Sequence, residues 1–174
     1  MKLTKRLLAM ALAGVMLLTI LTGCGGGKTG DRLVEEYMAT FISEHFSGIP
    51  VTHGVPEIKT VAEKFDPAWL DVDGSWKIRG GNNSTDERCQ ALQKVFSKYS
   101  NSNGYTVTLV AFEVDSTQSE LDQTMRVMMS SNYSGLWVYT HTGDPTAAKC
   151  ATRLVTRGDK SYRIAVIIYD HAAG

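Results

Sequence analysis

Two carboxylates, Glu113 and Glu120, are the side chains whose types and spacing come closest to a catalytic pair in this chain. A hydrolase of peptide or cell-wall material uses such a pair as general acid and general base. Glu120 also has a structural explanation, because it would complete a capping box at the start of an expected helix. The sequence has no Gly-x-Ser-x-Gly nucleophile motif, and its four histidines lack the i, i+4 spacing of metal-binding helices. We therefore expect no metal and no cofactor, and keep Glu113 and Glu120 as candidate cavity residues.

Cys24 ends a segment that begins with basic residues and continues as an apolar run over 7–21. The run has about 15 residues, which is too short for an ordinary membrane-spanning helix. The tetrapeptide 21–24, Leu-Thr-Gly-Cys, resembles the lipobox of bacterial lipoproteins. The resemblance implies a signal peptide over 1–23, a diacylglyceryl thioether on Cys24, and an anchor on the extracytoplasmic face of the cell membrane. Three glycines follow Cys24, so we expect 24–30 to be a flexible tether and 31–174 to be a single domain.

The charge balance excludes one class of partner. Removing 1–23 takes away three of the 18 basic residues and none of the 18 acidic ones, which leaves a net charge of about −3. No basic cluster follows the signal, so counterion release would contribute little affinity for a polyanion. We expect no nucleic-acid partner.

Cys89 and Cys150 are the cysteines that remain once Cys24 carries lipid. An even pair outside the cytoplasm predicts a disulfide, which would stabilise the fold by about 4 kcal/mol in the loop-entropy model. Two buried free thiols are the alternative.

Four stretches have helical periodicity. Leu33, Val34, Tyr37 and their successors recur at three- and four-residue steps over 31–46, and Asp31 is positioned to cap that helix. The other three expected helices cover 57–66, the segment from a Ser84 or Thr85 cap to Tyr99, and 117–130 with Ser116 or Thr117 as cap. Between the second and third lies a polar loop over 66–85, in which Trp69 and Trp76 are expected to anchor onto the core.

Strand signals cover 105–115, 135–142 and 162–169. The segment 146–157 is ambiguous. As one helix it would give a βαβ unit with parallel strands. As a strand over 151–157, joined to 162–169 by a Gly158-Asp159 turn, it would give an antiparallel hairpin. The β-branched residues of 152–156 favour the hairpin. We therefore expect an α/β fold, a three-layer α-β-α sandwich around a small, mainly antiparallel sheet.

Short motifs between 57 and 169 are similar to those of a known superfamily. The segment 96–99 (Phe-Ser-Lys-Tyr) with Asn-Gly at 103–104, the helix over 119–131 and the closing hairpin resemble a degenerate CAP domain, the domain of cysteine-rich secretory and pathogenesis-related proteins. The resemblance implies an α-β-α sandwich with a cavity built from two His and two Glu. In this chain Lys98 occupies the position of the family's first His, and Tyr133 or Ser134 lies near the position of the second. Of the four cavity residues of the family, only Glu120, and Glu113 less directly, therefore have a counterpart here. Without the imidazoles, no zinc site is carried over.

These observations predict a membrane-anchored lipoprotein that acts as a non-enzymatic binding or interaction module at the cell surface. Its partners would be the membrane, through Cys24, and an unidentified protein or small-molecule ligand. The alternatives are an envelope hydrolase using Glu113 and Glu120, and a small-ligand-binding lipoprotein.

Overall fold

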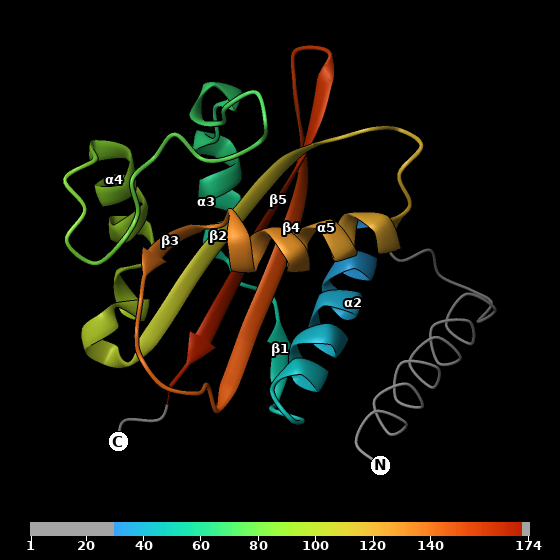
Figure 1. The fold of residues 1–174 in the computed structure, drawn as a ribbon. Helices are drawn as coiled ribbons and strands as arrows, with labels where there is room; N and C mark the ends of the chain where they lie inside the picture. Colours follow the sequence, from blue (N-terminus) through green and yellow to red (C-terminus); the bar gives the residue numbers. More distant parts are fainter. Residues whose placement is uncertain (1–29, 172–174) are drawn as a thin grey trace.

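The computed structural model describes residues 30–171 (Figure 1). Its α-helices are α2 (Gly30–His45), α3 (Glu57–Lys64), α4 (Glu87–Val95) and α5 (Glu120–Tyr133). Its strands are β1 (Val51–His53), β2 (Tyr105–Val114), β3 (Leu136–Tyr139), β4 (Ala147–Arg157) and β5 (Lys160–Asp170), and short 3-10 turns occur at Pro67–Trp69, Ser97–Tyr99 and Asn101–Asn103. The sequence therefore predicts the four helices and four of the five strands close to where they lie, and among the described strands only β1 was not predicted.

The strands form one open, mixed sheet in the order β1-β4-β5-β2-β3. β1 pairs with β4 in parallel, and every other pair is antiparallel. β4 and β5 are joined by Gly158 and Asp159, with Arg157 opposite Lys160, so the predicted hairpin is confirmed and the parallel βαβ alternative is wrong. Gly158 has a φ of 64°, a conformation that glycine adopts without strain. The hairpin is longer than predicted, because β4 already begins at Ala147.

The buried apolar side chains form two clusters, one with α3 and α4 and the other with α2 and α5. β2 contributes to both because successive side chains of a strand point to opposite faces. Leu109 and Ala111 lie in the first cluster, and Val110 and Phe112 in the second. Trp69 and Trp76 pack against the first cluster, as predicted.

The helix starts differ from the sequence predictions at three places. Asp31 lies inside α2, and its carboxylate accepts a hydrogen bond from the backbone N–H of Leu154 at 3.0 Å. α4 is capped by Asp86, one residue after the predicted Thr85. α5 is capped by Ser119 in a capping box with Asp122, so Glu120 is not the capping-box residue.

A local turn explains the shifted start of α5. The Asp115 carboxylate accepts hydrogen bonds from both the backbone N–H and the hydroxyl of Thr117, each at 2.9 Å. Thr117 is thereby engaged in an Asx turn and is not free to cap the helix. The next hydroxyl that can do so is that of Ser119.

Carboxylates of α2 cover the part of β4 that the short strand β1 leaves unpaired. The backbone N–H of Thr152 donates to Glu35 Oε1 at 2.9 Å, and that of Leu154 donates to Asp31. Charged side chains placed on an open strand edge block pairing with another chain. The same contacts hold the first turns of α2 against the sheet.

Candidate functional site

A cleft of about 610 Å³ lies where the loop after α3 meets the end of β2, the start of β5 and Arg126 of α5. Residues from four separate parts of the chain line this cleft, so it is not a hollow formed within a single loop. Its carboxylates are Asp71, Asp73, Glu113 and Asp115. Its cationic side chains are Lys77, Arg126 and Lys160. We call this site the charged cleft.

Glu113 is already paired inside the charged cleft. Lys160 Nζ lies 2.8 Å from Glu113 Oε2, and about half of each side chain is exposed. The guanidinium of Arg126 lies 4.4 Å from the centre of the Phe112 ring, and its Nη1 donates to the Glu113 backbone carbonyl at 3.1 Å. Glu113 of β2 therefore contacts both the hairpin end, through Lys160, and α5, through Arg126.

Two of the cleft carboxylates are stabilised as anions. The Ser75 hydroxyl and backbone N–H both donate to Asp73, which lowers the pKa of that carboxyl. Hydrogen bonds from the backbone N–H and hydroxyl of Thr117 likewise lower the pKa of Asp115. These groups hold charge in the cleft at neutral pH and do not store a proton for general acid catalysis.

Other groups of the cleft remain available to a ligand. The Lys77 ammonium has no hydrogen-bond or ion-pair partner among residues 30–171. Val72 projects from the loop with its side chain fully exposed. With four carboxylates and three cations in one concave site, the arrangement suits a small ligand that carries both charges.

The structure does not bring the two predicted cavity residues into this cleft together. Glu113 lines it, but Glu120 is not among its lining residues. Glu120 lies in the first turn of α5 beside α2, with Oε1 3.4 Å from where a Cβ on Gly30 would be. Asp71, Asp73 and Lys77 line the cleft but were not predicted as site residues, because their sequence context is that of a polar loop.

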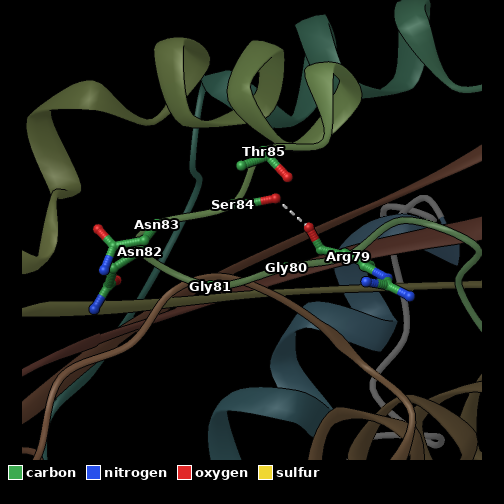
Figure 2. Close-up of a pocket in the computed structure, with 7 residues that line it drawn as sticks. All are labelled: Arg79, Gly80, Gly81, Asn82, Asn83, Ser84 and Thr85. Atoms are coloured by element: carbon green, nitrogen blue, oxygen red, sulfur yellow. Dashed lines mark hydrogen bonds between the residues drawn. The ribbon is translucent and has the colours of Figure 1, made fainter.

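A second hollow, of about 410 Å³, is lined by the consecutive residues 79–85 (Figure 2). In Figure 2 the Ser84 hydroxyl donates to the Arg79 carbonyl across the loop. The loop is fastened to the outer edge of β3: Gly81 N donates to the Trp137 carbonyl at 2.6 Å, and the Asn82 side chain bonds both backbone groups of Thr140 at 2.9 Å. This hollow therefore results from the way in which the loop covers the edge of β3.

Cys89 and Cys150 are both free and buried, and they lie in different clusters. Cys89 packs with α4 on one face of the sheet. Cys150 lies on the other face, where its thiol points to the Glu35 carbonyl of α2 at 3.7 Å. Because the sheet lies between them, the structure does not bring the two sulfurs within bonding reach, and the predicted disulfide is absent from it.

His141 and His171 lie side by side near Thr106. The rings of His141 and His171 lie 5.2 Å apart, and His171 Nε2 is 3.0 Å from the Thr106 hydroxyl. Burial, and then the neighbouring His141, lower the pKa of His171. Within residues 30–171, no group of three or more His, Cys, Asp or Glu side chains is arranged to hold a metal ion.

The residues that carry the CAP resemblance do not share a cavity. Lys98 pairs with Glu57 at 2.7 Å, next to Tyr99, whose ring contacts Tyr105 at the start of β2. Glu113 stands eight residues further along the same strand, about 27 Å away. Lys98 and Glu113 are thus separated by nearly the whole length of β2.

No protein-family model, curated protein or solved structure matches this chain. In residues 30–171, no helix has the length and apolar character needed to cross a bilayer. Cys24 and the signal-like segment before it lie outside the described residues, so the lipobox stays a prediction. The CAP resemblance also stays a prediction, because no comparison tests it.

Proposed function

We propose that this protein is a membrane-anchored, extracytoplasmic lipoprotein whose domain is a non-enzymatic binding module. Its ligand is a small zwitterionic molecule, such as a free amino acid or short peptide, held in the charged cleft. The observation that carries this proposal is the composition of the cleft, where fixed carboxylates and cations face one space and Lys77 is unpaired.

Binding fits this site better than hydrolysis. A general acid needs a carboxyl that keeps its proton near neutral pH, whereas hydrogen bonds lower the pKa of Asp73 and Asp115. Glu113 is paired with Lys160, and Glu120 lies outside the cleft lining. The paired-carboxylate hydrolase therefore has no geometric support.

The anchor rests on the lipobox-like tetrapeptide at 21–24. Cleavage before Cys24 would leave six steps of chain before Gly30, the first residue of α2. A lipid on Cys24 would then hold the domain close to the outer face of the membrane, which is where we propose that it works.

We further propose that the domain is a three-layer α-β-α sandwich, with α3 and α4 on one face of the sheet and α2 and α5 on the other. The two separate apolar clusters support this architecture. It is also the architecture that the CAP resemblance implies, although no common cavity accompanies it.

The experiment is calorimetric titration of the detergent-purified protein with free amino acids and dipeptides. Lys77→Ala should weaken binding about tenfold, equivalent to about 1.4 kcal/mol, through the loss of a charged contact. Lys94→Ala is the matched control, because Lys94 is an exposed lysine of α4 away from the cleft. Equal affinities for the two variants, or no binding of any probe to the wild type, would contradict the assignment of the cleft.

A further inference from the structure

Within 30–171, most of the large exposed apolar side chains lie on α5 and on β4. Six large apolar residues are exposed there, and four of them belong to these two elements: Leu121 (39%), Met125 (44%), Met129 (63%) and Leu154 (43%). Single exposed apolar residues need no explanation, but a group of them marks a contact surface.

Three of the four form a line along α5. Leu121, Met125 and Met129 are four residues apart, so they fall on one side of the helix. The opposite side carries the fully buried Thr124 and Val127, which face the sheet. We call Leu121, Met125 and Met129 the apolar stripe; it extends about 12 Å along the helix axis.

The apolar stripe begins where the chain enters the domain. Glu120, directly before Leu121, lies against Gly30, and Figure 1 shows the first turns of α2 and α5 next to each other. Leu154 is adjacent as well, since its backbone N–H donates to Asp31 at 3.0 Å. The first residue of the apolar stripe and Leu154 therefore lie close to the residue at which the tether ends.

The length of chain before Gly30 limits what can cover this surface. Six steps of chain join Cys24 to Gly30, which span at most about 20 Å when fully extended. We infer that the apolar stripe rests on the outer leaflet of the membrane in which the lipid on Cys24 is inserted. This inference rests on the proposed anchor, and it adds that the domain is held in one orientation.

The charges near the stripe specify the kind of membrane contact. Acidic Glu120 and Asp122 flank Leu121, and basic Arg32 and Arg153 lie next to Asp31 and Leu154. The local charges are therefore mixed, and we do not assign the contact to attraction of anionic headgroups. The contact is apolar, with Met and Leu side chains entering the boundary between headgroups and acyl chains. Arg126, on another flank of α5, lines the charged cleft, which places the cleft near the membrane surface.

The test uses the full chain expressed in a bacterium, purified in detergent and reconstituted into phosphatidylcholine vesicles with doxyl-labelled lipid. Met129→Cys carries a fluorescent maleimide, and Ala91→Cys on α4 is the matched control, also at an exposed helix position. Cys89 and Cys150 are buried and do not compete for the label. We expect doxyl quenching about twofold or more stronger at position 129 than at position 91, because only the stripe reaches the acyl boundary.

Intact mass of the same samples separates the two proposals. Equal quenching at 129 and 91 with a lipid present on Cys24 overturns the orientation alone. Absence of lipid on Cys24 overturns the anchor, and the orientation with it. A third outcome is that doxyl lipid does not quench the probe at position 129, whereas its fluorescence in lipid-free detergent changes with protein concentration. This outcome identifies a second copy of the chain as the occupant of the stripe and also overturns the inference.

Discussion

The face of the sheet under α3 and α4 is packed with apolar and aromatic side chains, whereas the face under α2 and α5 also buries a complete charged group. Phe65 lies within 6.4 Å of three aromatic rings in the first cluster. On the second face the Arg163 side chain is only 2% exposed, where it pairs with Asp31 and donates to Gln123 Oε1 at 2.9 Å. Polar contacts occur on both faces, since the half-buried Arg157 donates to the Ala62 and Phe65 carbonyls at the end of α3. What distinguishes the second face is that its polar contacts include a fully buried guanidinium in an ion pair.

This difference has a direct consequence for α2. A helix held only by apolar contacts can shift along a sheet at modest cost, whereas an ion pair and backbone hydrogen bonds define one position. Asp31 bonds Arg163 and the Leu154 backbone, and Glu35 bonds the Thr152 backbone. The polar contacts therefore concentrate at the end of α2 where, in our proposal, the membrane tether begins.

The largest effect should follow from breaking the buried ion pair. Asp31→Ala leaves the Arg163 guanidinium buried with Gln123 as its remaining partner, so we expect a loss of about 3–5 kcal/mol in the free energy of unfolding. Urea denaturation measures it. Glu44→Ala, an exposed carboxylate of α2, is the control and should change stability by less than about 0.5 kcal/mol. Equal losses for the two variants would show that the pair does not hold α2.

The apolar face should respond through packing instead. Leu92 is 1% exposed in the cluster of α3 and α4, and Leu92→Ala should cost about 2–5 kcal/mol through lost burial and a cavity. Because the sheet separates Leu92 from Asp31, the double variant should show the sum of the two losses within about 0.5 kcal/mol. A strong departure from additivity in denaturation curves would mean that the two faces are not independent.

The reactivity of the Cys89 and Cys150 thiols tests the same separation of the two faces. Burial raises the pKa of the Cys150 thiol from 9.0 to about 12, which leaves about a thousandfold less reactive thiolate, and burial also raises the pKa of Cys89. We expect slow reaction with a disulfide reagent in the native protein and two reactive thiols, Cys89 and Cys150, once Cys24 is lipidated and the protein is unfolded without reductant. If no reactive thiol is found after unfolding, Cys89 and Cys150 form the disulfide that the cysteine count predicts.

A smaller effect should appear in the pH dependence of stability. Burial raises the pKa of Glu35 above its ordinary 4.5, outweighing the hydrogen bond from Thr152. The folded state then holds this proton more tightly than the unfolded state, so the contribution of Glu35 is fully present below pH 4.5 and is lost as pH rises through the raised pKa. Glu35→Gln should therefore remove part of the decline in stability above pH 4.5, as denaturation at a series of pH values would measure. A steeper decline in the variant would contradict the sign.

The sequence predicts what depends on neighbours along the chain and misses what depends on distant contacts. The periodicity of 31–46 and the turn residues Gly158 and Asp159 are local signals, and both predictions agree with the structure. β1 has only three residues, and its pairing with β4 joins segments almost a hundred residues apart, so no local pattern marks it. The helix caps were misplaced because Ser, Thr and Asp cluster before α4 and α5, and side-chain turns decide which of them is free to cap.

The same limit applies to the candidate site. Glu113 was singled out by residue type, and it does line a cleft, but with Lys160 and the 71–77 loop rather than with Glu120. Asp73 has the appearance of a turn residue, and in the structure it makes a turn with Ser75 while also lining the cleft. Only the meeting of the loop with the hairpin end reveals its second role.

The most direct test of the account is the intact mass of the protein extracted from membranes of an expressing bacterium. A lipid-anchored module predicts one species, residues 24–174 with a diacylglyceryl thioether on Cys24, and an uncleaved or unlipidated product from Cys24→Ala. Wild-type protein with an unmodified Cys24, or a Cys24→Ala variant that still carries fatty acid, would contradict the account.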